Sequence, residues 1–400
     1  ARPTIEIANT GEKHIIDGVE MEFVYVLDTE APVEIMVWLP QLKAFCTAED
    51  MTHNMHNLQT LRGAKVRNGL LWSKAIDTAI ERYGDQVEVS FSTHHWPTWG
   101  NERIVDYWEA QRDMYRYLHD QTLHLANRGL TPDEIAEEMK LPASLASQFN
   151  CRGYYGTLSH NVKAQYDLYF GWFNGNPAHL NPLPPSELGS KYVEAIGGAD
   201  KVLEVAKASY AKGEYRWVAT LLDNLVFAEP ENKEARRLLA DTYTQLGYQA
   251  ESGPWRNFYL TGARDLFKKD VPYTSQLIND GVLAQMDMGT LLDYCAIQLN
   301  GEKAAGKEAV ININFTDTKE KVMLMLNNGV LNHRLDSQDE KADLTLEIEK
   351  MDFIKLFFGR TDLQTLLKTN KVRTTGNTQA MDVICSAYEP ADPNFKIVLP

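Results

Sequence analysis

The stretch from Phe45 to Gly100 decides the fold, because strand, helix and loop signals meet there with the chain's densest group of histidines. It opens with FCTAEDMTHNMHNL (45–58), continues through TLRGAK (60–65) and closes with THHWPTWG (93–100). Four of the ten histidines lie in it, and two of them have carboxylates nearby in the sequence. Imidazole and carboxylate are ligands for divalent metals, and imidazole exchanges protons near neutral pH. The stretch therefore predicts a metal or acid–base site.

Residue patterns around this stretch predict an α/β arrangement. Residues 5–29 and 34–40 are rich in alternating, β-branched and aromatic residues, which indicates strands. Residues 49–63 have helical potential, Trp72 to Tyr83 predicts an amphipathic helix ended by Gly84, and residues 86–93 predict a further strand. His94 then follows the carboxyl end of a strand, where α/β proteins usually assemble their ligands.

These elements suggest a metal site whose ligands come from distant positions. Glu49 and His94 carry normal zinc-ligand groups, and Glu30, in a turn, would supply a third. Other readings of the same residues stay open. A turn carboxylate such as Glu30 is usually solvated. On a helix, His53 and His56 would be either a metal-binding pair or a pair that is hydrogen-bonded or exposed.

Composition and charge restrict the class of protein. Four hundred residues, 44% of them hydrophobic, predict two or three folded domains. A formal net charge of −15 argues against a nucleic-acid partner, which requires a basic surface. No apolar run reaches the roughly 20 residues of a membrane-spanning helix. The four cysteines form no CxxC pair, so we expect neither a zinc ribbon nor a disulfide scaffold.

The rest of the chain is helical first and mixed afterwards. Residues 101–127 predict a long helix, and Thr131 with Pro132 predicts a capped helix start. Residues 206–250 resemble a tetratricopeptide helix pair. From Pro272 the pattern changes to α+β, with expected strands at 309–315, 321–326, 330–334 and 342–348 and short helices at 290–300, 351–358 and 363–368.

Several long strings resemble one family, the alkyl sulfatases of the metallo-β-lactamase superfamily, which hydrolyse dodecyl sulfate and related esters. The resemblance covers essentially the whole chain. The strings are FCTAED (45–50), THNMHNL (52–58), LRGA (61–64), HHWPTWGN (94–101), YYGTLSHN (154–161) and YFGWFNGNP (169–177).

The resemblance implies a multidomain chain with α/β, all-α and α+β parts. Residues 1–125 would be the carboxyl-terminal half of a metallo-β-lactamase-like αββα sandwich. Residues 126–268 would be an α-helical dimerisation domain, to which the tetratricopeptide-like pair at 206–250 belongs. Residues 272–400 would be a sterol-carrier-like α+β domain. A homodimer is the expected assembly, and an alkyl sulfate ester the expected substrate.

The resemblance also implies a two-zinc site. Glu30 would bind one zinc, Glu49 would bridge both, and His94 would bind the other. The family's remaining ligands come from a His-x-His-x-Asp-His motif, which this sequence lacks, so we expect the amino-terminal half of the same protein to supply them.

Sulfate-binding and proton-donating residues follow from the same resemblance. Arg62 and Asn57 match positions that grip sulfate, whereas an arginine near a helix end is otherwise a surface charge. His160 is the candidate proton donor or sulfate contact, with a loop-holding role as its alternative, and Tyr155 is a weaker candidate for the same pocket.

The expected function is zinc-dependent hydrolysis of alkyl sulfate esters to alcohol and inorganic sulfate. Two alternatives stay open: a non-catalytic lipid or surfactant carrier with an incomplete lactamase-like half, and a hydrolase of another ester such as a phosphate. The chain begins with Ala1 and shows no signal sequence, and a periplasmic or secreted location is the expectation.

Overall fold

The computed structural model describes residues 4–267, 279–392 and 394–400. The chain divides into two compact units, one made of Ile5–Lys269 with Lys396–Pro400 and the other of Asp270–Phe395 with Ala1–Thr4. The predicted domain limits at 268 and 272 lie outside the described residues. Each unit is treated by itself below.

The first unit begins with a six-stranded sheet in the order β1-β2-β3-β4-β5-β6. Neighbouring strands are antiparallel except β4 and β5, which run parallel. The long connection between these two strands contains helix α1 (Gly69–Tyr83), as a parallel pair requires. The strands are β1 (Lys13–Ile16), β2 (Val19–Leu27), β3 (Val33–Leu39), β4 (Ala44–Cys46), β5 (Val89–Phe91) and β6 (Thr98–Trp99).

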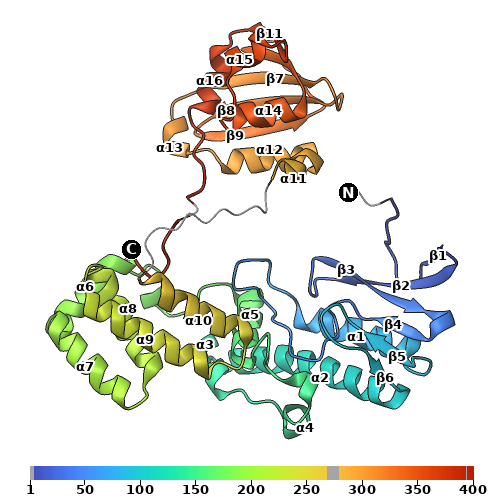
Figure 1. The fold of residues 1–400 in the computed structure, drawn as a ribbon, viewed down its shortest axis with the longest axis vertical. Coiled ribbons are helices and arrows are strands. Elements are labelled where there is room, and N and C mark those ends of the chain that lie inside the picture. The colour runs from blue at the N-terminus through green and yellow to red at the C-terminus, as the bar shows by residue number, and fades with distance from the viewer. Residues whose placement is uncertain (1–3, 268–278, 393) are drawn as a thin grey trace. The chain divides into compact units, whose positions relative to one another are not determined.

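Helices α1 and α2 (Asn101–Ala126) pack together and cover one face of this sheet (Figure 1). The side chain of Asn68 caps α1 by accepting from the backbone N–H groups of Leu70 and Leu71, which are otherwise unpaired. Trp72, on the apolar face of α1, is buried, and its ring stacks on Tyr115 of α2 with the ring centroids 4.6 Å apart. Both predicted helices are therefore confirmed, with α1 starting three residues earlier.

The other face of the sheet is also apolar but only half-covered. Strand alternation places Phe23 beside Val37 and Cys46, and Tyr25 beside Ile35, on that face. Apart from buried Phe23, these side chains are half-buried, and at the strand ends Leu27 is 48% and Val33 54% exposed. A two-sided apolar sheet is typical of a layer that packs against another layer.

Two local predictions were wrong, and a third was confirmed only in part. Residues 49–63 form no helix, and residues 4–7 form no strand. The strand predicted over 86–93 is limited to β5. The segment after Glu49 is not helical because its backbone groups pair with distant ones: Met55 N–H donates to the Arg152 carbonyl, and Gly156 N–H donates to the Met55 carbonyl, both at 2.8 Å.

The helical part continues the first unit without a break at residue 125. One hydrophobic core extends from Val24 to Tyr166, and a second collects residues from Val193 to Leu266 together with Leu399. A domain limit at 125 stays a prediction. The helices are α3 (Pro132–Glu138), α4 (Ala143–Ala146), α5 (Leu158–Phe170), α6 (Pro185–Ile196), α7 (Ala199–Ala211), α8 (Tyr215–Ala228), α9 (Lys233–Gln249) and α10 (Gly253–Asp265).

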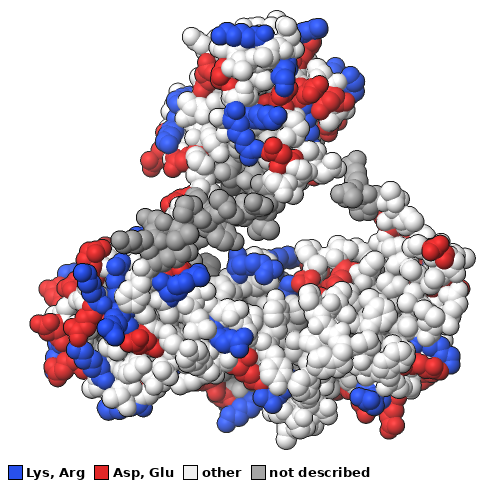
Figure 2. All heavy atoms as spheres, viewed as in Figure 1, with Lys and Arg blue, Asp and Glu red and all other residues white. Residues whose placement is uncertain are grey.

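Figure 2 shows how charge is distributed on one face of this unit. Acidic and basic side chains alternate densely over the region of α6 to α9, whereas they are sparse over the region of the sheet, α1 and α2. The capped helix start predicted at Thr131 and Pro132 is confirmed, and Thr131 forms a capping box with Glu134. Among the described residues, no helix has the length and apolarity needed to cross a membrane.

The second unit is α+β, as predicted. Its mixed sheet has the order β11-β10-β7-β8-β9, and only β10 and β7 pair in parallel. The patterns predicted four of its strands but missed β11 and α16. The strands are β7 (Ala309–Phe315), β8 (Lys321–Asn327), β9 (Val330–Leu335), β10 (Leu344–Ile348) and β11 (Val372–Gly376).

The helices of the second unit pack around a core of buried leucine, isoleucine and phenylalanine side chains. The sterol-carrier-like fold expected for this region stays a prediction. The helices are α11 (Asp280–Gln285), α12 (Met288–Ile297), α13 (Gly301–Ala304), α14 (Lys350–Phe357), α15 (Leu363–Lys368) and α16 (Gln379–Cys385).

A charged cluster links α1 to strand β2 and is the basis of a prediction about stability. Glu22 accepts from Arg82 at 2.6 Å and from the Tyr83 hydroxyl at 2.9 Å, and it pairs with Lys13 at 3.2 Å. Burial raises the pKa of Glu22, but these bonds outweigh burial and hold the pKa below its usual 4.5. Its contribution to stability is therefore complete above about pH 4.5 and is lost as the pH falls further.

We expect Glu22→Gln to lower the free energy of unfolding at pH 7 by about 1–2 kcal/mol, because charged hydrogen bonds are replaced by weaker neutral ones. The difference should shrink steadily below about pH 4.5. Urea unfolding at several pH values measures it. A difference that stays constant down to pH 3 would show that the carboxylate charge is not responsible.

Candidate active site

Strand pairing brings Glu49 and His94 together. Glu49 follows β4 and His94 follows β5, and because these strands are parallel neighbours their carboxyl ends lie at the same edge. Glu49 Oε1 contacts His94 Nδ1 and the Thr93 hydroxyl at hydrogen-bond distance. Glu49 Oε2 lies 3.6 Å from Nε2 of His56. Burial raises the pKa of Glu49, but these partners outweigh it and lower the pKa to about 2.

Three further carboxylates surround Glu49. Burial raises the pKa of Glu34 to about 7, with the charges of Glu30 and Glu49 adding to the rise. Asp50 is fully buried, and burial together with the neighbouring Glu34 charge raises its pKa well above normal. The Oε2 atom of Glu34 has no hydrogen-bond partner among the described residues. These raised pKa values mean that Glu34 and Asp50 hold their protons more tightly, so the site favours added positive charge, whether from protons or from a bound cation.

Arg67 is the buried cation of this cluster, and the sequence patterns did not single it out. Its guanidinium pairs with the carboxylate of Glu30, and its Nε donates to the Glu30 carbonyl at 2.7 Å. Nη1 donates to both the carbonyl and the side-chain oxygen of Asn57. Arg67 is only 8% exposed. It thus ties the turn that holds Glu30 to the loop that holds Asn57.

The three predicted metal ligands are only partly assembled. Glu49 and His94 are in contact, whereas the Glu30 carboxylate forms an ion pair with Arg67. The charges of both Glu30 and Glu49 raise the pKa values of Glu34 and Asp50. Within the described residues, no group of three His, Cys, Asp or Glu side chains is arranged to hold a metal ion. The donor types nevertheless fit zinc, and the buried Glu34 Oε2 atom has no hydrogen-bond partner among the described residues.

The predicted sulfate-binding residues lie on the same loop. Asn57 is 4% exposed and its side-chain oxygen accepts from Arg67, which leaves its amide N–H groups to donate elsewhere. Arg62 is exposed and forms no ion pair or hydrogen bond with another described residue. It precedes Gly63, whose φ of 94° is accessible mainly to glycine, in a turn closed by the bond from Gly63 N–H to the Thr60 carbonyl.

His160 is held by both ring nitrogens. Nε2 lies 2.6 Å from the Gln59 carbonyl, and Nδ1 lies 3.2 Å from the indole nitrogen of Trp255. A carbonyl only accepts and an indole only donates, so the ring is neutral with its proton on Nε2. Burial lowers the pKa of His160 further. This geometry favours the loop-holding alternative, and the proton-donor role stays a prediction.

Tyr155, the weaker candidate, packs its ring against His56 at a centroid distance of 4.8 Å.

Two other histidines of the stretch 45–100, His53 and His95, form a separate pair. His53 bonds the Thr98 hydroxyl at 2.8 Å and packs against His95, and burial lowers its pKa to about 4. His53 therefore takes the hydrogen-bonding alternative rather than joining Glu49.

Asn161 positions the loop 56–58 and leads to a second prediction. This buried residue accepts from Leu58 N–H and donates to the His56 carbonyl, both at 2.9 Å. Asn161→Leu would leave both backbone groups without partners and should lower the free energy of unfolding by about 2–4 kcal/mol. Denaturant unfolding measures this loss. Gln249→Leu, at an exposed position of α9, is the control and should change stability by less than about 0.5 kcal/mol.

Comparisons with known proteins show which family the chain belongs to. Residues 131–269 match the family model described as alkyl sulfatase dimerisation, and residues 276–400 match the one described as alkyl sulfatase C-terminal. A linear primary-alkylsulfatase of a Pseudomonas species is 46% identical over 400 residues, covering 100% of this chain and 59% of the relative. A second linear primary-alkylsulfatase, of Pseudomonas sp. (strain ATCC 19151), is 31% identical over 94% of this chain and 72% of its own length.

The solved structure of the stereoselective inverting sec-alkylsulfatase Pisa1 from Pseudomonas superposes with a TM-score of 0.96 at 41% identity. The match covers 100% of this chain and 63% of Pisa1. The family models and the relatives thus define the family of this chain. The chain belongs to the alkyl sulfatase family, and it spans about three fifths of the length of the first curated relatives that it matches.

Proposed function

We propose that this chain is the carboxyl-terminal part of a zinc-dependent enzyme that hydrolyses alkyl sulfate esters to alcohol and inorganic sulfate. The observation that carries the proposal is the contact of Glu49 with His94 inside a cluster of four carboxylates balanced by one buried guanidinium. Because the pKa values of Glu34 and Asp50 are raised, the cluster favours added positive charge, which divalent cations would supply.

Glu30, Glu49 and His94 would hold the metal from this side. The chemistry that zinc supplies when bound is Lewis-acid activation of water and neutralisation of negative charge. Arg62 would bind two sulfate oxygens through its guanidinium fork, and the Asn57 amide would donate to a third. His160 would hold the Gln59 carbonyl and so fix the loop that carries Arg62.

The remaining metal ligands would come from an amino-terminal part of the same protein, as in a metallo-β-lactamase-like sandwich. The half-covered apolar face of the sheet supports this, because Tyr25, Ile35 and Val37 would be buried by a second layer. A homodimer formed through the helical region is proposed from the family model over residues 131–269. Export to the periplasm or beyond also stays a proposal.

Sulfate release from dodecyl sulfate tests the proposal. The complete protein, loaded with zinc, should release sulfate, and a chelator should stop the release. This chain by itself should release none. Equal activity with and without chelator would refute the zinc dependence. Faster turnover of an alkyl phosphate would favour the other-ester alternative, and tight binding without turnover would favour the carrier.

A further inference from the structure

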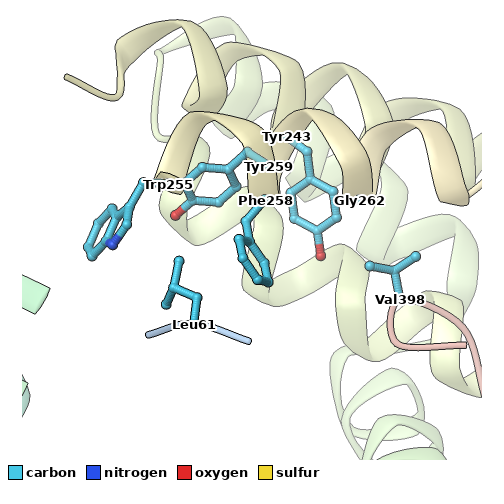
Figure 3. A pocket seen from close by; sticks show the side chains of 7 residues that line it. All are labelled: Leu61, Tyr243, Trp255, Phe258, Tyr259, Gly262 and Val398. Carbon is cyan, nitrogen blue, oxygen red and sulfur yellow. The ribbon is translucent and has the colours of Figure 1, made fainter. Parts of the chain in front are cut away.

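An open apolar pocket lies beside the loop that carries Arg62. Its volume is about 310 Å³, within the range of small-molecule sites. Figure 3 shows the side chains of Trp255, Phe258 and Tyr259 projecting from α10 with Leu61 opposite them. Tyr243, Gly262 and Val398 complete the lining. Phe258 is 52% and Leu61 39% exposed, so the pocket offers apolar surface to a ligand.

Two polar groups of the candidate site are linked to this pocket. Leu61, which lines it, directly precedes Arg62, whose guanidinium has no ion pair among the described residues. Trp255 lines it too, and its indole N–H donates to His160 rather than into the pocket. The lining is therefore apolar, with an exposed cation at the adjacent residue. That combination suits an anion with a hydrocarbon tail.

We infer that this pocket binds the alkyl chain of the sulfate ester while Arg62 binds its head group. The inference rests on the proposed function, to which it adds the residues that recognise chain length. Burial of each methylene group contributes about fourfold in affinity. The value of kcat/KM should therefore rise with chain length until the pocket is filled.

Gly262 allows the pocket to be filled selectively. A Cβ built on Gly262 would lie 3.5 Å from both Tyr243 and Val398, which is ordinary contact, so a side chain fits there and larger ones extend into the pocket. Thr261, the neighbouring residue of α10, is exposed. Thr261→Leu thus places the same leucine side chain on the same helix without lining the pocket and serves as the control.

The experiment compares butyl, hexyl, octyl and decyl sulfate, each below its micelle concentration, with the complete zinc-loaded protein. Gly262→Leu should lower kcat/KM for decyl sulfate at least tenfold, with a loss that shrinks as the chain shortens. Phe258→Ala, which removes an exposed wall and should not affect folding, should also weaken the dependence on chain length. Thr261→Leu should match the unsubstituted protein. If all four proteins show the same dependence on chain length, the inference is wrong and the proposed function stands.

A binding measurement separates the two hypotheses if no ester is hydrolysed. In that case the proposed function fails, and the tryptophan fluorescence of this chain, to which Trp255 contributes, is titrated with octyl sulfate and with sodium sulfate. A response to octyl sulfate that is absent for sodium sulfate and lost in Gly262→Leu supports an alkyl-chain pocket. No response to octyl sulfate, or the same response from Gly262→Leu, overturns it.

Discussion

Replacing Arg67 by methionine should lower the free energy of unfolding of this chain by about 3–5 kcal/mol. Arg67 is buried, forms an ion pair with Glu30, and its charge also acts on Glu34. Methionine keeps most of the side-chain volume but leaves the carboxylates without their counter-charge, and it leaves the Glu30 and Asn57 carbonyls without a donor. The loss should exceed that of any surface substitution in this unit.

Urea unfolding, followed by tryptophan fluorescence, measures this loss. The matched control is Arg62→Met, an identical substitution five residues earlier at an exposed position without a described partner. It should change the free energy of unfolding by less than about 0.5 kcal/mol. Equal losses for the two variants would show that the buried guanidinium does not hold the acidic cluster together.

Glu49→Ala should reduce sulfate-ester hydrolysis by the complete protein by about three orders of magnitude or more, because it removes the carboxylate proposed to bridge two cations. The fold should survive the change. Glu49 adds to the repulsion felt by Glu34 and Asp50, so its removal relieves strain among buried charges as well as breaking the contact with His94.

Initial rates on dodecyl sulfate, with thermal unfolding in parallel, test this expectation. Glu88→Ala is the control, since Glu88 lies near β5 and forms an exposed pair with Lys43. It should retain nearly full activity. An active Glu49→Ala enzyme would contradict the assigned role, and an unfolded one would contradict the expectation that the fold survives the change.

Local sequence patterns were sufficient to predict the elements whose apolar residues recur at a regular period. The helix ended by Gly84 and the four strands of the second unit were predictable because apolar residues alternate or recur within each segment. β11 was missed because its residues, VRTTG, are mostly polar and it obtains its pairing from β10. Here the tertiary partner, rather than the segment, decides the structure.

The loop after Glu49 was misread for the same reason. Its helical spacing is real, but its backbone is paired by groups about one hundred residues away, chiefly Arg152, Gly156 and Asn161. A Cβ at Gly156 would lie 2.6 Å from the His56 carbonyl oxygen, so the backbones around His56 and Gly156 pack too closely to admit a side chain. No local pattern reports such a contact.

Within the candidate site, the contact of Glu49 with His94 follows from strand order, because each residue comes just after one of two parallel strands. The part played by Arg67 could not be predicted, since one arginine near a helix start resembles any surface charge. Only the fold places it against Glu30 and Asn57. The roles of Glu30, Arg62, Tyr155 and His160 in binding and catalysis stay predictions.

The most direct test of the central claim is the zinc content of the complete protein, measured by elemental analysis after removal of loosely bound metal. We predict two zinc ions per chain, falling to one or none in both Glu49→Ala and His94→Ala, with Glu88→Ala unchanged. Two zinc ions per chain retained in Glu49→Ala would contradict the assignment of this carboxylate, and of the site built around it, to metal binding.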